Sequence, residues 1–306
     1  MPTVVPGKLA IVGAGNMGNA IARLFAINGW TVVLIDPSDH ARAASQERLS
    51  DLASQDAGVR LRWHADVSAT QGADLIIEAA PEDLALKRKL FGQLEAHCSA
   101  STLIATNTSG ISINQLARDL AHPERFVGTH FFTPADVIPL VEVIACERSS
   151  TATTQSIIDI LRAVGKLPVL VRKDIPGFIA NRLQHALARE AMSLLEQGVA
   201  TADDIDTVAK WSLGIRLALT GPLEQRDING LDIHLAIASY LYPDLESAQA
   251  PLAVLSDKVQ QGHLGVKSGQ GFYDWASPDR KASLRHKEAA LSSLVDHIKT
   301  IQPKEH

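Results

Sequence analysis

Residues 129–143, THFFTPADVIPLVEV, hold one histidine and one glutamate in otherwise apolar surroundings. His130 and Glu142 each lie in a short apolar run that predicts a buried strand. An imidazole titrates near neutral pH, and a carboxylate bound to its second nitrogen would orient the ring and stabilise the imidazolium. Such a pair could move a proton in acid–base catalysis. A lone histidine on an apolar strand is more often a packing residue, so the pattern leaves both interpretations open.

A second candidate for chemistry is the glycine-rich stretch IVGAGNMGNAIA. Its first glycine permits a tight turn, the second lets the backbone approach a pyrophosphate, and the third allows close packing of helix and strand. The N-terminus of the following helix would face the phosphates. A glycine-rich turn without a ligand is the alternative. The predicted dinucleotide loop consists of Gly13, Ala14, Gly15, Asn16, Met17 and Gly18.

An acidic residue at the end of the second predicted strand bears on the choice of cofactor. Asp36 lies near the expected distance of about 20 residues after the glycine loop, where a carboxylate can bind a ribose 2′-hydroxyl. The same carboxylate would repel a 2′-phosphate, and no arginine follows it directly. We therefore expect NAD rather than NADP.

The elements that must position these residues alternate in type along the first part of the chain. Short β-branched runs separated by helical patterns are typical of a parallel sheet with helices on both faces. The predicted strands are residues 8–12, 31–35, 74–80, 102–106, 125–132, 140–145 and 167–173. The predicted helices between them are residues 19–29, 83–97 and 152–163.

After KDIPGF the pattern changes to helices almost without strands. Residues 178–198 have helical apolar spacing and end on Gly198, and residues 201–214 begin with a threonine cap and early acids. We therefore expect an α/β protein with two domains. Residues 1–174 would form a Rossmann-type doubly wound NAD-binding domain. Residues 175–306 would form an all-helical domain for substrate binding and dimerisation.

The composition excludes several classes of function. The chain has 306 residues, a net charge of −5 and no basic block, so we expect no nucleic-acid partner. No apolar run has the roughly 18 residues of a membrane span. The two cysteines, Cys98 and Cys146, lack metal-ligand spacing, and the histidines form no such cluster. We expect a cytoplasmic protein without a metal.

Several motifs resemble the L-3-hydroxyacyl-CoA dehydrogenase family. The motifs GAGNMG, ADLIIEAAPEDLALKRKLF, IATNTSGISI, RFVGTHFFTPADVIPLVEVI, DIPGFIANRL and GHLGVKSGQGFYDW occur in the family's order from Leu9 to Trp275. The resemblance implies an NAD-binding domain, a helical dimerisation domain and an active site in the cleft between them. It also implies that the enzyme acts on a CH–OH group.

The resemblance assigns roles to individual residues. It implies that His130 is the catalytic acid–base group, that Glu142 is its partner, and that Ser109 and Asn181 bind the substrate oxygen. A hydroxyl and an amide can both hydrogen-bond a reacting oxygen. The remaining positions that match the family near the cofactor are Glu82, Lys87, Asn107, Thr133 and Lys267.

Three departures from the family concern the cofactor site and the substrate. Thr133 stands where the family usually has asparagine near the nicotinamide. Only 36 residues separate Asp36 from Ala73, where acyl-CoA members carry a longer helical hairpin that touches CoA. We expect one helix and one strand there. WSLGIRLALTGPLE resembles the gulonate and carnitine dehydrogenase branches, and Arg216, after a helix expected to end at Gly214, could bind a substrate carboxylate. A surface arginine that caps helix carbonyls is the alternative.

These features together predict an NAD-dependent dehydrogenase of fatty acid metabolism that forms a homodimer. Its expected substrate is an L-3-hydroxyacyl-CoA, which it would oxidise to the 3-ketoacyl-CoA. The first alternative is the same chemistry on a free hydroxy acid, such as carnitine, gulonate or a ring-bearing acid. The second is a non-catalytic NAD-binding protein of the kind found among lens crystallins, against which the presence of both His130 and Glu142 argues.

Overall fold

The chain folds into two compact units. The computed structural model describes residues 4–55 and 60–301. Unit 1 is Met1–Arg182 and unit 2 is Leu183–His306, so the division falls within helix α7 (Ala180–Glu196). The domain boundary expected at 174/175 lies a few residues earlier and stays a prediction for the functional domains.

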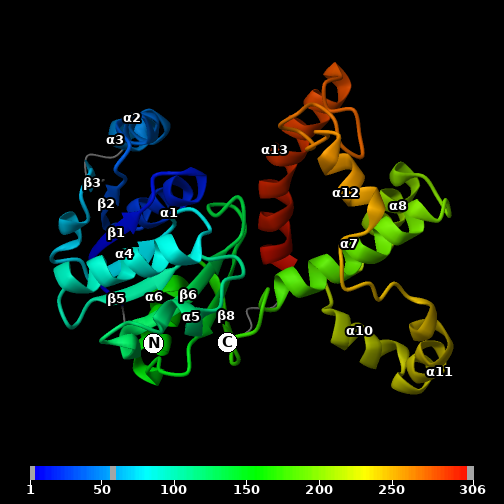
Figure 1. The fold of residues 1–306 in the computed structure, drawn as a ribbon, viewed down its shortest axis with the longest axis horizontal. Coiled ribbons are helices and arrows are strands. Elements are labelled where there is room, and N and C mark those ends of the chain that lie inside the picture. The colour runs from blue at the N-terminus through cyan, green and yellow to red at the C-terminus, as the bar shows by residue number, and fades with distance from the viewer. Residues whose placement is uncertain (1–3, 56–59, 302–306) are drawn as a thin grey trace. The chain divides into compact units, whose positions relative to one another are not determined.

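Unit 1 is built on one eight-stranded sheet (Figure 1). The strand order is β3-β2-β1-β4-β5-β6-β7-β8. Neighbouring strands are parallel except β6 and β7, which are antiparallel. The strands are β1 (Lys8–Val12), β2 (Thr31–Ile35), β3 (Arg60–His64), β4 (Leu75–Glu78), β5 (Leu103–Thr106), β6 (Phe126–Phe131), β7 (Leu140–Ala145) and β8 (Leu167–Val171). The doubly wound fold is confirmed, with one antiparallel pair because the short connection between β6 and β7 cannot make a crossover.

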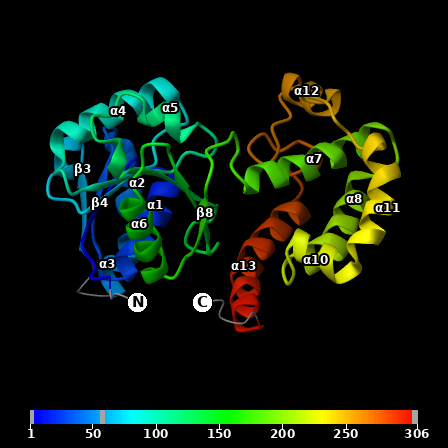
Figure 2. The ribbon, with the colours of Figure 1, turned by 90° about the horizontal axis from the view of Figure 1, so that it is seen from below.

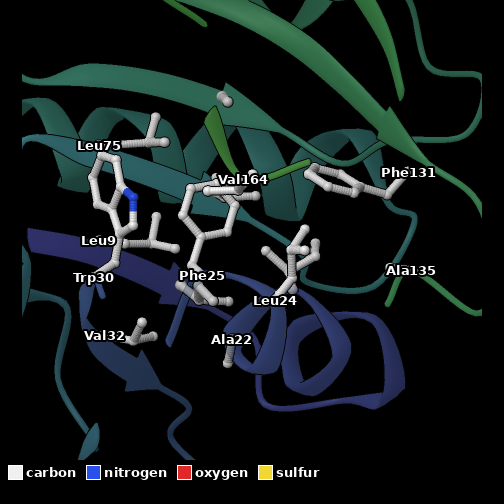
Figure 3. Close-up of a cluster of buried hydrophobic side chains, with 14 of the residues drawn as sticks. Leu9, Ala22, Leu24, Phe25, Trp30, Val32, Leu75, Phe131, Ala135 and Val164 are labelled. Atoms are coloured by element: carbon white, nitrogen blue, oxygen red, sulfur yellow. The ribbon is translucent and has the colours of Figure 1, made fainter. Parts of the chain in front are cut away.

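Helices cover both faces of the sheet (Figure 2). Helices α1 (Asn16–Ile27) and α6 (Thr151–Ala163) bury one face, where the rings of Phe25 and Trp30 meet edge to face at 5.3 Å (Figure 3). Helices α4 (Leu84–His97) and α5 (Ile113–Ala117) bury the other, where Phe91 packs against Phe126 at 4.8 Å. Unit 1 also contains two 3₁₀ turns, η1 (Val67–Thr70) and η2 (Pro123–Arg125).

The segment after β2 differs from its prediction. It forms two short helices, α2 (Asp39–Arg48) and α3 (Ser50–Gln55), where one was expected. Leu49 separates them and is 1% exposed, and Leu52 is buried as well. Both leucines pack in the same hydrophobic cluster of unit 1.

Unit 2 is helical, as predicted. Its only β-structure among the described residues is the pair of isolated bridges that Gln270 makes with Gly265 and Asp274. Its elements after α7 are α8 (Ala202–Val208), the π-helical turn η3 (Ala209–Gly214), α9 (Ile215–Leu217), α10 (Pro222–Asn229), α11 (Leu231–Leu241), the 3₁₀ turn η4 (Tyr242–Asp244), α12 (Ala253–Gln260) and α13 (Pro278–Ile301). None of the helices described is long and apolar enough to cross a membrane.

Two glycines of unit 2 were expected to end helices, and the structure confirms only one of the two helix ends. Gly198, at φ +70°, follows α7 and ends it, as a left-handed glycine does. Gly214 was expected to end its helix, and this prediction is wrong. Its φ of −58° and ψ of −47° are helical, so the helix runs on to Leu217.

Candidate active site and cofactor loop

The histidine and glutamate of residues 129–143 face each other in the sheet. The antiparallel register of β6 and β7 places His130 opposite Glu142, and Nδ1 lies 2.8 Å from Oε2. The two residues are only 4% and 1% exposed. Because an ionised carboxylate can only accept, Nδ1 carries the proton in this bond. The twelve-residue spacing is thus the path around one hairpin.

The second carboxylate oxygen of Glu142 binds the start of α7. Oε1 accepts the backbone N–H groups of Ile179 at 2.9 Å and Ala180 at 3.0 Å. Burial acts to raise the pKa of Glu142, but the hydrogen bonds from His130, Ala180 and Ile179 outweigh it and lower the pKa below its ordinary value. The carboxylate is therefore held ionised beside the imidazole.

Two aromatic side chains enclose the imidazole, and the sequence analysis missed both. The ring of Phe132 lies 4.4 Å from that of His130, and the ring of Phe178 lies 5.7 Å away. Phe178 is fully buried and has a φ of 51°, unusual for a bulky residue. Within residues 4–55 and 60–301, Nε2 of His130 has no hydrogen-bond partner, so this nitrogen is available for a ligand.

The loop after β5 meets the start of α7. The side-chain amide of Asn181 donates from Nδ2 to the carbonyl of Ser109 at 2.7 Å. The carbonyl oxygen of the Asn107 side chain accepts the backbone N–H of Phe131 at 2.9 Å, next to His130. The fold therefore brings these polar residues from separate motifs into one neighbourhood of unit 1.

Glu82 and Lys87 occupy very different environments. Oε1 of Glu82 accepts the hydroxyl of Thr108 at 2.5 Å and the backbone N–H of Ser109 at 2.9 Å, so Glu82 shapes the loop after β5. Lys87 is fully buried, and its ammonium donates to Glu78 at 2.7 Å. Glu78, which the sequence analysis did not select, also accepts the hydroxyl of Thr106 at 2.6 Å. Its only signal in the sequence is a carboxylate at the end of an apolar strand.

The glycine loop lies where the strand order reverses, between β1 and β4. Gly13 has a φ of +113°, and a Cβ there would lie 2.5 Å from the carbonyl oxygen of Ala79. A Cβ on Gly18 would lie 1.9 Å from the carbonyl oxygen of Gly13. A Cβ on Gly15 would meet nothing within 4 Å, which leaves open space over the loop. The loop therefore fits a dinucleotide at the position that open α/β sheets use for ligands.

Asp36 is held beside this loop. Its Oδ2 accepts the backbone N–H of Ala14 at 3.0 Å, and its Oδ1 accepts that of Ser38 at 2.9 Å. Across the loop, the hydroxyl of Thr133 lies 3.2 Å from the sulfur of Met17. These contacts place an acid at one end of the glycine loop and Thr133 at the other, so the residues present fit NAD.

Two predicted site residues belong to unit 2. Lys267 is exposed on the turn between the bridged residues Gly265 and Gln270. Arg216 is exposed on α9. No group of three potential metal ligands occurs in the part of the chain that the structure describes.

Comparison with known families covers most of the chain. Residues 8–175 match the family model described as 3-hydroxyacyl-CoA dehydrogenase, NAD binding domain. Residues 177–275 match that described as 3-hydroxyacyl-CoA dehydrogenase, C-terminal domain. The first match confirms NAD as the predicted cofactor.

Individual relatives differ in their substrates. The chain is 36% identical, over 95% of its length and 97% of the relative's, to 5-formyl-3-hydroxy-2-methylpyridine 4-carboxylate 5-dehydrogenase of Mesorhizobium japonicum. A crystal structure of a dehydrogenase of that name, described as an NAD⁺-dependent dismutase, has a TM-score of 0.89, 34% identity and coverage of 98% and 100%. A crystal structure of (S)-3-hydroxybutyryl-CoA dehydrogenase from Ralstonia eutropha has a TM-score of 0.70, 34% identity and coverage of 88% and 99%.

Proposed function

Because the chain belongs to the 3-hydroxyacyl-CoA dehydrogenase family and is an NAD-dependent dehydrogenase, we propose that it acts on a free ring-bearing acid rather than on an acyl-CoA. One observation carries the choice. The likeness to the pyridine 4-carboxylate dehydrogenase covers 98% of this chain and 100% of that one, at a TM-score of 0.89. The substrate class is therefore a small aromatic carboxylate with an oxidisable oxygen-bearing substituent.

The short segment after β2 supports the same choice. Helices α2 and α3 have ten and six residues. Acyl-CoA members of the family carry a longer helical hairpin at this position, and that hairpin contacts CoA. A free acid needs no such contact.

The proposed reaction uses the dyad of unit 1. NAD, when bound at the glycine loop, would supply the hydride acceptor for the carbon that bears the hydroxyl. Nε2 of His130 takes the hydroxyl proton, which leaves a carbonyl product and an imidazolium. Glu142 remains ionised and stabilises that imidazolium through Nδ1. The side chains of Ser109 and Asn181 hydrogen-bond the reacting oxygen.

The cofactor would be held by residues that surround the glycine loop. Backbone N–H groups of the loop would bind the pyrophosphate, and Asp36 would bind the adenosine ribose. Thr133 and Asn107 would hold the nicotinamide end. Glu82 holds the loop after β5, and the buried Lys87 would act indirectly, through its ion pairs with Glu78 and Glu82. Lys267 is carried as a candidate on its motif GVKSG alone. We also propose that the protein is a cytoplasmic homodimer formed through unit 2.

A second candidate, oxidation of a 3-hydroxyacyl-CoA in fatty acid metabolism, is favoured by a different observation. The (S)-3-hydroxybutyryl-CoA dehydrogenase shares 34% identity with this chain over 99% of its own length. The chemistry of the dyad is the same for both substrates. Only substrate recognition separates them.

A substrate panel tests the proposal. NADH formation would be followed with a hydroxymethylpyridine carboxylate, 3-hydroxybutyrate and 3-hydroxybutyryl-CoA, with His130→Gln as the inactive control. We expect kcat/KM for the pyridine acid to exceed that for the CoA ester by at least about tenfold, a difference of roughly 1.4 kcal/mol. A preference for the CoA ester would replace the proposal by the second candidate. Turnover of no substrate would support the non-catalytic alternative.

A further inference from the structure

A pocket of about 220 Å³ lies within unit 2, lined by residues of α9, of α10 and of the segment between them. It combines one cationic side chain with neutral polar and apolar ones. Its lining residues are Arg216, Leu219, Thr220, Gln225, Ile228 and Asn229. The volume is smaller than the roughly 300–1,000 Å³ of pockets for drug-sized ligands, so the occupant must be small.

The guanidinium of Arg216 is oriented but not neutralised. Its Nε donates to the carbonyl of Ser212 at 2.7 Å, one helical turn earlier, and this bond limits how the group can rotate. Among the described residues, no carboxylate lies within ion-pair distance of Arg216. The two terminal nitrogens therefore remain for an anion.

Two other arginines of unit 2 contact protein partners. Arg226 lies 2.8 Å from the ring nitrogen of His234. Arg280 forms an ion pair with Asp203 at 2.9 Å. Arg216 differs from both because it lines a pocket. Capping of helix carbonyls, the alternative considered above, occupies only its Nε.

We propose that this pocket binds the ionised carboxylate of a small aromatic acid. Arg216 pairs with the carboxylate in the planar, forked geometry that guanidinium groups favour. The apolar side chains of Leu219 and Ile228 contact the ring, and Gln225 and Asn229 offer hydrogen bonds to ring substituents. The inference deepens the proposed function and rests on it in one respect, namely that the acid is the substrate.

The binding test uses benzoate, which cannot be oxidised by this reaction. Isothermal titration would be done on the full protein with NAD at saturation, so that the cofactor site is filled. Benzamide is the matched neutral ligand, and Arg226→Met is the matched variant, which removes the same charge outside the pocket. We expect Arg216→Met to weaken benzoate binding at least about tenfold, as loss of a charge-assisted pair implies, and Arg226→Met to leave it unchanged.

Two results would overturn the inference. One is equal binding of benzoate to the wild type and Arg216→Met, and the other is equal affinity for benzoate and benzamide. Either result leaves the proposed function intact if the pyridine acid is still oxidised. Conversely, Arg216-dependent benzoate binding without turnover of that acid would support the pocket and reject the proposed substrate.

Discussion

The two units of this protein bury their apolar side chains to very different extents. All the fully buried hydrophobic side chains of the described residues lie in unit 1. In unit 2, large apolar residues remain open to solvent, including Trp211 at 74%, Leu223 at 80% and Leu235 at 70%. Exposed apolar surface of this kind marks an interaction site. The contrast leaves unit 2 with more apolar surface for a partner, which in our proposal is a second copy of the chain.

The buried polar groups show the same contrast. Unit 1 buries Glu78, Lys87, His130 and Glu142, each with a hydrogen-bonding partner, whereas Ser193 is the buried polar residue of unit 2. Burial of charge is unfavourable unless it is paired. Unit 1 therefore holds the groups that need a rigid, desolvated setting, and that is where we place the chemistry.

The largest expected effect concerns that placement. His130→Gln should lower kcat by roughly 10²–10⁴, the usual contribution of general acid–base catalysis, with NAD affinity nearly kept. His185→Gln, on the part of α7 that belongs to unit 2, is the control and should retain kcat. Steady-state kinetics with NAD titration measures both. Full activity of His130→Gln would show that His130 is not the catalytic base and would contradict the assignment of the active site to unit 1.

The next effect tests whether the buried cluster around Phe91 contributes to the free energy of unfolding. Phe91 is fully buried against Phe126, so Phe91→Ala should lower the free energy of unfolding by about 3–5 kcal/mol. Leu86→Ala, on the same helix but at a 43% exposed position, should change it far less. Denaturant unfolding compares the two variants. Equal losses would contradict the assignment of the core.

A smaller effect is expected at the exposed face of unit 2. Trp211→Asp introduces a charge where a second copy would cover an apolar ring. We expect the dimer dissociation constant to rise by at least about tenfold, since large aromatic residues dominate interface energies. Sedimentation velocity over a range of concentrations measures it. A wild-type protein that is monomeric throughout that range would refute the homodimer.

The pH dependence of stability should reflect Glu142. Its folded pKa is lowered, so its contribution is present above the ordinary value of 4.5 and is lost as pH falls through the folded pKa. Wild type should therefore exceed Glu142→Gln in stability near neutral pH, and this margin should shrink in acid. Thermal unfolding from neutral to acidic pH checks the slope. A margin independent of pH would mean that folding does not lower the pKa of Glu142.

The smallest effect belongs to unit 2. Burial, with the nearby Asp206, raises the pKa of Tyr273 to about 12, and its hydroxyl lies 2.9 Å from that carboxylate. Tyr240 and Tyr242 are both 71% exposed. In a rapid-mixing ultraviolet titration, the wild type should show one phenol that ionises late, and Tyr273→Phe should lack it. Stability from Tyr273 is present below its ordinary pKa of 10 and is lost as pH rises toward 12.

Local patterns in the sequence determined most of unit 1. The strands β1, β2 and β7 have the bounds that their apolar, β-branched runs predict, because such runs can bury both faces only inside a sheet. The spacing of Gly13 and Gly18 likewise predicted the turn after β1. The structure gives the reason, because a side chain at either position would clash with the backbone. The helical character of unit 2 followed from its apolar periodicity.

Only the tertiary structure decided which of these residues meet. Three contacts join residues that are 12, 9 and 72 positions apart: His130 with Glu142, Lys87 with Glu78, and Asn181 with Ser109. The helix end expected at Gly214 was wrong for a related reason. A glycine can adopt either a helical or a left-handed conformation, and the surrounding backbone decides which. Local propensity acts over a few residues, whereas the pairing of strands and the burial of charge depend on contacts across the whole unit.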